Sequence, residues 1–396
     1  MVFDLQRARD DTPGCSNVLH FNNAGASLMP GPVLNSIVDH LVLESQIGGY
    51  EAAEVARDKV ESLYRAAARL MGGGPDEIAV VDNATRAWDM AFYSIPFEIG
   101  DVILTSVAEY ASNFIAYLQV AKRTGAKIQV VPNDESGAIS VDALAASIDD
   151  RVRLISLIHV PTNGGLINPA EKVGQIAKEA GVLYLLDACQ SVGQMPVNVE
   201  RIGCHMLSAT GRKFLRGPRG TGFLYVRRET LEQLEPPLLD LHSASWVEKD
   251  RYEIRKDARR FETWEANYAA NIGLATAIDY ALEQDINVTW PRIRQLADAL
   301  RSSLVLIPGV TLRDLGSEKC GIVTFTVQGK KPDQIRLALA EEKINVAVSP
   351  KNYTLLDMES RDLGDGVVRA SVHYYNSEEE IDRFCEALEV ILAKCK

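Results

Sequence analysis

Short, continuously apolar runs alternate with helical patterns between about residue 77 and residue 187, and this alternation constrains the fold more than any other feature. Strands that are buried on both faces appear as unbroken apolar runs, and such strands form parallel sheets covered by helices. The pattern therefore predicts an α/β fold with a mostly parallel sheet. The expected strands are EIAVV, DVILTS, KIQVVP, VRLISLIHV and LYLLDA, followed after a gap by MLSATG and GTGFLYV.

The pattern changes at about residue 287, where short strands (GVTLRDL, GIVTFTVQG, INVAVS, VVRASV) mix with two helical stretches near 332–342 and 377–393. This mixture predicts a small α+β domain. We expect an N-terminal segment (1–25) that joins the small domain, a large domain (26–285) and a small C-terminal domain (286–396). Because no linker rich in Gly, Pro or Ser separates the parts, we expect close packing, with a ligand cleft between the domains.

Charge and cysteine usage exclude several classes of function. The 396 residues include 42 Lys plus Arg against 54 Asp plus Glu, a net charge of −12, which disfavours nucleic acid and anionic membranes as partners. Neither a signal-peptide core nor an apolar run of the roughly 20 residues needed to span a membrane is present, so a cytoplasmic location is expected. The six cysteines form no CxxC pair; this indicates reduced thiols and neither a zinc site nor a disulfide framework.

Two side chains in this pattern are candidates for chemistry. Asp187 ends the apolar run LYLLDA, and ligands of open α/β sheets bind beyond the carboxyl ends of strands. A carboxylate there needs a cationic or hydrogen-bonding partner, such as a protonated pyridine nitrogen; alternatively, it caps the next turn. Lys213 follows MLSATG and precedes a loop rich in Gly and Pro. An isolated lysine is usually a solvated surface residue, but burial beside Arg212 would lower its pKa and make it a better carbonyl nucleophile.

These residues belong to longer motifs, Asp187-Ala188-Cys189-Gln190-Ser191, then Thr210-Gly211-Arg212-Lys213-Phe214 and the glycine-rich stretch 217–222. Together they resemble the signature of the class V aminotransferases, a family of pyridoxal 5′-phosphate (PLP) enzymes that includes cysteine desulfurases, cystine lyase, isopenicillin N epimerase and ergothioneine-pathway C–S lyases. The resemblance extends from residues 21–25 to residues 369–376. It implies PLP fold-type I, with a mostly parallel, seven-stranded-type sheet in the large domain.

The resemblance also implies roles for residues that would hold the cofactor. Lys213 would carry PLP as a Schiff base, Asp187 would pair with the ring nitrogen and Gln190 would donate to the phenolic oxygen. A carboxylate at the ring nitrogen keeps the ring protonated and thus an electron sink. The phosphate would lie against Ala84, Thr85, Thr210 and Arg212. Taken alone, the stretch 83–86 indicates a plain helix N-cap.

Further roles concern the ring face and the substrate. Tyr110 would stack on the pyridine ring, where most relatives have a His. Thr162 or Asn163 would contact the cofactor oxygen and the substrate carboxylate, and the sequence does not choose between them. Arg369 would bind the substrate carboxylate in a bidentate pair, with Asn23 as a second contact. No metal ligand is expected.

The chain departs from its relatives at several positions. Cysteine desulfurases carry a nucleophilic cysteine in the loop that corresponds to 346–357, which here contains none. Cys320 lies too early in the chain to replace it, and Cys189 stands where a small packing residue is usual. Arg212 replaces a common His, and Glu265 replaces a Thr that reaches the neighbouring subunit in many relatives.

The missing cysteine leads us to expect a PLP-dependent lyase that cleaves a C–S bond of a cysteine-derived amino acid by β-elimination. An aminotransferase or epimerase is the alternative, and a cysteine desulfurase ranks below both. A non-catalytic cofactor-binding protein ranks last. Residues 46–53 resemble a stretch of the ergothioneine-pathway lyases, although Gly48-Gly49 equally suits a turn between helices. A homodimer is expected from the family, with 252–268 as a contact region.

Overall fold

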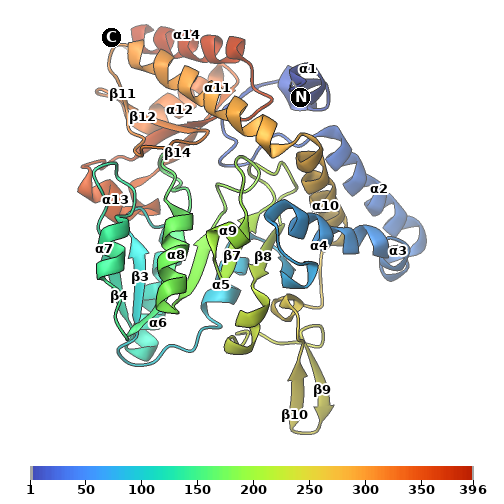
Figure 1. Cartoon of the computed structure of the whole chain (residues 1–396). Coiled ribbons are helices and arrows are strands. Elements are labelled where there is room, and N and C mark those ends of the chain that lie inside the picture. Colours follow the sequence, from blue (N-terminus) through green and yellow to red (C-terminus); the bar gives the residue numbers. More distant parts are fainter. Residues whose placement is uncertain (1–2, 395–396) are drawn as a thin grey trace.

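The computed structural model describes residues 3–394 and contains a large α/β part with a smaller α+β part packed on one edge of its sheet (Figure 1). The large sheet has seven strands in the order β2-β8-β7-β6-β5-β3-β4. Neighbouring strands pair in parallel except at β8, which is antiparallel to both β2 and β7. The predicted fold class is therefore confirmed. The strands are β2 (Ile78–Val81), β3 (Val102–Ser106), β4 (Lys127–Val131), β5 (Val152–Ile158), β6 (Leu183–Asp187), β7 (Met206–Thr210) and β8 (Gly222–Val226).

Helices cover both faces of this sheet, which explains why its strands appear as unbroken apolar runs. Successive residues of one strand point to opposite faces. Tyr184 and Leu186 of β6 accordingly pack in one core, with residues of α4, α8 and α10, while Leu183 and Leu185 pack in the other, with residues of α5 and α6. The helices of this part are α4 (Arg57–Met71), α5 (Ala84–Phe92), α6 (Ala111–Thr124), α7 (Val141–Ala146), α8 (Ala170–Ala180), α9 (Val199–Ile202) and α10 (Tyr268–Glu283).

The small part is built on an antiparallel sheet in the order β11-β12-β15-β14, from Val310–Leu312, Ile322–Val327, Val367–Ser371 and Ala347–Ser349. Helices α11 (Ile286–Leu306), α12 (Pro332–Glu341) and α14 (Glu378–Lys394) pack against it. The start of the chain belongs to the same core, because Ala8, Leu19 and Phe21 are buried there. Short β1 (Leu19–His20) also pairs in parallel with β13 (Ile344–Asn345). The domain boundaries at residues 25 and 285 stay predictions from the sequence.

Several elements were not placed by the sequence pattern. Helices α1 (Leu5–Asp10), α2 (Gly31–Ile47) and α3 (Gly49–Val55) precede the large sheet, and α13 (Leu355–Ser360) follows β14. Gly48 separates α2 from α3 at a φ of 100°, a conformation that glycine adopts without strain. A hairpin of β9 (Ala244–Glu248) and β10 (Arg251–Ile254) protrudes from the body of the molecule (Figure 1). Within residues 3–394, no helix is long and apolar enough to cross a membrane.

A buried arginine connects the N-terminal segment, the large part and the small part. Arg216 is 1% exposed, and its guanidinium donates to the Leu28 carbonyl (2.9 Å), to the Tyr374 hydroxyl (2.9 Å) and to Thr12 Oγ1 (2.5 Å). The cation also lies 4.3 Å from the centre of the Tyr375 ring. Among the described residues it forms no ion pair, so these acceptors and rings replace its hydration.

We expect Arg216→Met to lower the free energy of unfolding by about 3 kcal/mol, because the substitution removes three hydrogen bonds and leaves buried acceptors without a donor. Urea denaturation of the purified protein measures this loss. Arg219→Met, in the same loop but exposed, is the matched control and should change stability by less than about 0.5 kcal/mol. Equal losses in the two variants would contradict a bridging role for Arg216.

Candidate active site

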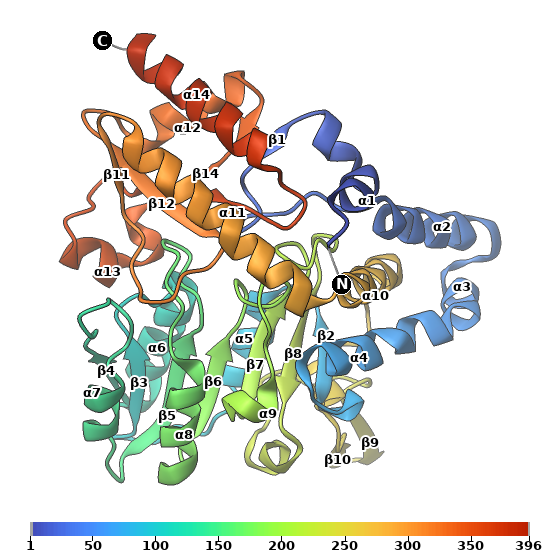
Figure 2. The ribbon, with the colours of Figure 1, turned by 45° about the horizontal axis from the view of Figure 1, so that its top comes forward.

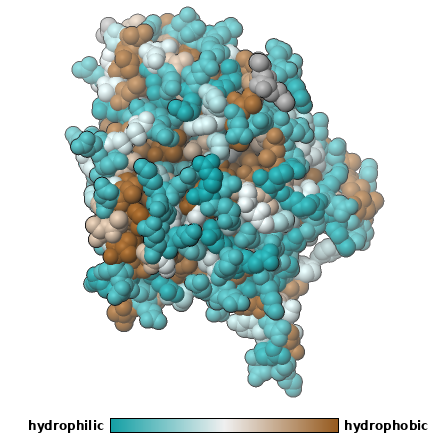
Figure 3. All heavy atoms as spheres, in the orientation of Figure 1, coloured by the Kyte–Doolittle hydropathy of each residue, from teal (hydrophilic) through white to brown (hydrophobic). Residues whose placement is uncertain are grey.

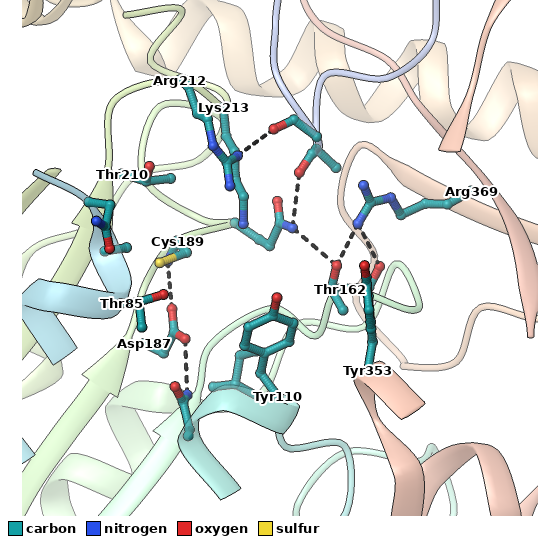
Figure 4. A pocket seen from close by; sticks show the side chains of 17 residues that line it. Thr85, Tyr110, Thr162, Asp187, Cys189, Thr210, Arg212, Lys213, Tyr353 and Arg369 are labelled. Atoms are coloured by element: carbon teal, nitrogen blue, oxygen red, sulfur yellow. Dashed lines mark hydrogen bonds between the residues drawn. The ribbon is translucent and has the colours of Figure 1, made fainter. Parts of the chain in front are cut away.

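The carboxyl ends of the parallel strands face the small part of the molecule (Figure 2). A pocket lies there, lined by residues that follow these strands and by residues of the small part. Parallel strands end at the same edge of a sheet, so the loops that follow them converge there. The pocket brings together residues from eight separate stretches of the chain (Figure 4). Those that the sequence singled out are Ala84, Thr85, Tyr110, Thr162, Asp187, Gln190, Thr210, Arg212, Lys213 and Arg369.

Lys213 lies in the loop that joins β7 to β8, with its amine inside the pocket (Figure 4). Burial lowers the pKa of this amine to about 8, and the Arg212 and Arg369 cations act in the same direction. A neutral amine is the form that attacks a carbonyl and accepts a proton. Arg212 is held by the Gly25 carbonyl, to which its Nη1 donates at 2.5 Å.

Asp187 is the last residue of β6, and its side chain is 6% exposed. One carboxylate oxygen accepts from the backbone N–H of Cys189 at 3.0 Å, and the other accepts from the Asn113 amide at 3.1 Å. Two donors hold the carboxylate in place, and a carboxylate oxygen has room for more than one hydrogen bond. Asp187 is therefore positioned to accept from a donor inside the pocket.

The start of α5 provides backbone hydrogen-bond donors to another wall of the pocket. Asn83 caps this helix by accepting from the Arg86 N–H at 2.9 Å. Ala84 and Thr85 occupy the first helical positions, where backbone N–H groups have no partner within the helix, and both residues line the pocket. β8 runs close to this turn, since a Cβ on Gly222 would lie 2.9 Å from the Ala84 nitrogen. Such a helix start favours an anion, above all a phosphate.

A polar cluster around Arg369 lies on the side of the pocket that the small part forms. Arg369 of β15 is 7% exposed and donates to Thr162 Oγ1 (2.5 Å) and to the Thr162 carbonyl (3.2 Å). Its Nε is buried and without a hydrogen-bond partner, as is Oε1 of Gln190. Burial lowers the pKa of Arg369 to about 10, and the Arg212 cation contributes to that shift. Arg369 and Gln190 both line the pocket, so a polar group bound there could pair with these two atoms.

Two aromatic rings close the pocket. Tyr110 precedes α6, and its ring meets that of Tyr353 edge to face, with centroids 6.2 Å apart. Sequence reasoning did not assign a role to Tyr353 or to Asn113, although both line the pocket. Tyr353 lies in the loop without the cysteine, within the segment 350–365 that the sequence indicates as a pocket wall or cover, but no local pattern singles out this ring. The i, i+4 spacing of Glu109 and Asn113 at the start of a predicted helix is the one signal that could have indicated Asn113.

Asn23 and Asn163 are not among the described residues that line the pocket. The Asn23 amide donates to the Ser371 carbonyl at 2.8 Å and its oxygen accepts from the Tyr375 hydroxyl at 2.5 Å. The Asn163 amide instead donates to Asp357 at 2.6 Å. Both side chains therefore join the small part to neighbouring segments, and their roles toward a substrate remain predictions.

The cysteines and Glu265 occupy different places. Cys189 lines the pocket, and burial raises the pKa of its thiol well above the ordinary value. Cys320 is buried outside the pocket, with its pKa raised to about 11 by burial, and Glu265 is exposed. The prediction of a reduced thiol at Cys395 lies outside the described residues. Within residues 3–394, no cluster of three or more His, Cys, Asp or Glu side chains has the arrangement of a metal site.

Known proteins match this chain over nearly its whole length. The family model "Aminotransferase class-V" matches residues 19–384. A "Probable cysteine desulfurase" of Pyrococcus abyssi is 30% identical and aligns with 97% of this chain and 96% of its own. The apo structure of a cysteine desulfurase from Thermococcus onnurineus NA1 superposes with a TM-score of 0.90 at 27% identity, covering 100% of this chain and 99% of the other.

A further solved structure shares the fold and holds the cofactor. It is a lysine-to-alanine variant of C-DES with glycine covalently linked to its PLP cofactor, and it superposes with a TM-score of 0.86 at 24% identity, covering 96% of this chain and 98% of the other. The donors and cations of the pocket fit such a group. The α5 start and Arg212 suit a phosphate, Asp187 suits a protonated ring nitrogen, and Lys213 suits an aldehyde.

The named relatives contradict the C–S lyase expected from sequence. That prediction ranked cysteine desulfurases below lyases, aminotransferases and epimerases, whereas the relatives and the solved structure at 27% identity are named cysteine desulfurases. The prediction was wrong because it treated the missing cysteine as evidence about the reaction. A loop without a thiol shows only that the sulfur acceptor is not in that loop. It does not show which reaction the enzyme catalyses.

The resemblance of the motifs is confirmed by the family match, and the predicted sheet by the superposed structures. PLP is the cofactor that this family uses, and the pocket presents a lysine, a carboxylate and a helix start that fit it. The chain therefore belongs to the class V aminotransferase family of PLP-dependent enzymes.

Proposed function

We propose that this enzyme removes the sulfur of L-cysteine, as the names of its relatives indicate. The observation that carries the proposal is the match of "Probable cysteine desulfurase" proteins to nearly the entire chain, 30% identical over 391 residues in one case and 28% over 397 in another. The arrangement of the pocket supports it, because Arg369, Arg212 and Lys213 surround a space that favours a small anionic substrate.

Each pocket residue has a proposed task in holding the cofactor. Lys213 would attach it, Asp187 would accept from the ring nitrogen, and Gln190 and Thr162 would contact the phenolic oxygen. The N–H groups of Ala84 and Thr85, together with Thr210 and Arg212, would hold the phosphate. Tyr110 would cover the ring face. PLP supplies an electron sink that stabilises negative charge at Cα of the amino acid.

The protein's own groups handle the substrate and its protons. Arg369 binds the α-carboxylate, because a buried guanidinium offers two parallel donors. With the cofactor bound, the Lys213 amine would be the group that takes the proton from Cα and returns it. Its lowered pKa suits both steps near neutral pH.

The sulfur acceptor is a thiol supplied from outside the chain. The loop at 346–357 contains no cysteine, and the pocket thiol of Cys189 is a poor nucleophile because burial raises its pKa. The balanced reaction is L-cysteine plus R–SH giving L-alanine plus R–S–SH. The Cβ–S bond breaks, an S–S bond forms, and Cβ gains a proton.

We expect L-cysteine with an excess of dithiothreitol to yield alanine and sulfide in equal amounts, because dithiothreitol accepts the sulfur and then releases it. Amino-acid analysis and a sulfide assay measure both products. Lys213→Ala should lower the rate at least about a thousandfold, since it removes the proton carrier. Lys122→Ala, on the exposed side of α6, is the matched control and should leave it unchanged. Pyruvate and ammonia in place of alanine would contradict the proposal.

The lowered pKa of Lys213 predicts a pH dependence of cofactor attachment. Below about pH 8 the amine is protonated and unreactive, so the cofactor-free protein should capture PLP about tenfold faster at pH 9 than at pH 7. A lysine at the ordinary pKa would gain about a hundredfold over the same interval. Stopped-flow absorbance records the rate. Arg212→Gln should raise the midpoint, because it removes a cation that lowers the pKa; an unchanged midpoint would contradict this account.

We also propose that the enzyme is a homodimer in which α2 contributes to the interface. Leu34, Val38, Leu41 and Val42 form one stripe of α2, and each is 46–50% exposed. The side of the helix next to this stripe packs on α10, where Ile37 lies against Gly273. A helix that is apolar on both sides is normally buried on both sides. Figure 3 shows apolar side chains at the right-hand edge, where Figure 1 places α2 and α3.

Sedimentation velocity tests this interface. The double variant Val38→Glu, Leu41→Glu should raise the dimer dissociation constant about thirtyfold or more, because two carboxylates would be desolvated in the interface. Ile99→Glu, at a position that is 88% exposed and away from α2, serves as the control and should leave the dimer intact. Unchanged association of the double variant would place the interface elsewhere.

A further inference from the structure

A second carboxylate lies buried directly behind the pocket. Glu109, between β3 and α6, is 3% exposed and accepts four hydrogen bonds. Its Oε2 accepts from the Thr105 hydroxyl (2.8 Å) and the Tyr117 hydroxyl (3.0 Å), and its Oε1 accepts from the Tyr110 backbone N–H (2.8 Å) and the Asn113 amide (3.0 Å). So many donors are needed to keep a carboxylate ionised away from water. None of the tasks proposed above uses Glu109.

The Asn113 amide connects this carboxylate to Asp187. Its Nδ2 donates to Glu109 Oε1 at 3.0 Å and to Asp187 Oδ2 at 3.1 Å, the contact at the lower end of Asp187 in Figure 4. An amide nitrogen carries two hydrogens, so both are used and the orientation of the side chain is determined. Asn113 is 4% exposed, which leaves no water to compete for these bonds.

The two carboxylates therefore influence each other electrostatically. Burial raises the pKa of Glu109 to about 7, and the negative charge of Asp187 contributes to that increase. The effect is mutual. A negative charge on Glu109 also raises the proton affinity of a group that is hydrogen-bonded to Asp187 in the pocket. The titratable groups that face Glu109 are Tyr117 from α6, whose pKa is raised by burial, and Asp187 from β6.

We propose that Glu109 is a positioning residue that controls the proton on the cofactor's ring nitrogen through Asn113 and Asp187. The inference rests on the proposed role of Asp187 as the partner of that nitrogen. With Glu109 ionised, Asn113 is held and the negative charge on Asp187 is reinforced, so the ring stays protonated. A protonated ring is the stronger electron sink.

A purely structural role for Glu109 has a different consequence. Its bonds to Thr105 and Tyr117 also join β3 to α6, and their loss would lower stability without any effect on the cofactor. The test therefore needs a readout at the ring nitrogen itself. PLP labelled with ¹⁵N in the ring provides one, because the chemical shift of that nitrogen changes continuously with the position of the proton.

The experiment compares the ¹⁵N shift at pH 8 in the wild-type holoenzyme, Glu109→Gln and Asp187→Asn. Gln has nearly the shape of Glu and lacks its charge. We expect Glu109→Gln to move the shift toward the unprotonated value, in the same direction as Asp187→Asn and by a smaller amount. The difference between Glu109→Gln and wild type should shrink at pH 6, because the wild-type Glu109 itself gains a proton below about pH 7.

Glu262→Gln is the matched control. Glu262 is 6% exposed and accepts from the Tyr64 hydroxyl, the Val80 N–H and His242, yet it does not line the pocket. The control should leave the ¹⁵N shift unchanged even if it lowers the melting temperature. Equal movement of the shift in this variant would show that loss of any buried carboxylate has the effect, and would overturn the inference.

Asn113→Ala completes a double-mutant cycle. If Glu109 acts through Asn113, Glu109→Gln should have little further effect on the ¹⁵N shift once Asn113 is alanine. The inference is overturned if Glu109→Gln leaves the shift unchanged, or changes it equally with and without Asn113. An unchanged shift in Asp187→Asn would instead refute the proposed role of Asp187, and this separates the two failures.

Discussion

The charge on Asp187 is the constraint on which the site depends. A carboxylate at the end of a buried strand is expensive unless donors surround it, and the chain provides a backbone N–H, the Asn113 amide and an opening toward the pocket. We propose that the cofactor's ring nitrogen faces this opening. The same Asn113 amide also donates to Glu109. The position of the Asp187 carboxylate therefore depends on hydrogen bonds in the core between β3, β5 and α6.

The positive charges of the pocket complement this carboxylate. Lys213, Arg212 and Arg369 come from two distant parts of the chain. Burial lowers the pKa of Lys213 and of Arg369, and the Arg212 cation lowers both further. Such a cluster is unstable unless anions occupy it. A phosphate and a substrate carboxylate are two such anions, which explains why a PLP enzyme of this family tolerates three cations at one edge of a sheet. The same repulsion keeps the lysine amine reactive.

The fold and the main motif could be predicted from the sequence for a physical reason. Buried parallel strands impose apolar runs of recognisable length, and Asp187 and Lys213 follow such runs directly. Arg369 could be placed only through the family resemblance, because an arginine in a strand of the small domain has no local signal. Asn23 and Asn163 show the limit of this reasoning. Both are predicted substrate contacts and stay predictions, while the structure shows their amides donating to Ser371 and Asp357.

The sequence by itself determined the α/β architecture and the cofactor, and it indicated a lysine and a carboxylate for the site, because each depends on short-range pattern or on a motif with a narrow chemical purpose. Only the tertiary structure decided which side chains from distant segments meet. Tyr353 reaches the pocket, Arg216 joins three parts of the chain, and Asn113 lies between two carboxylates. These contacts arise from the packing of helices on the sheet and of the small part on its edge, and no local pattern encodes the distance between residues that the chain separates by 70 positions or more.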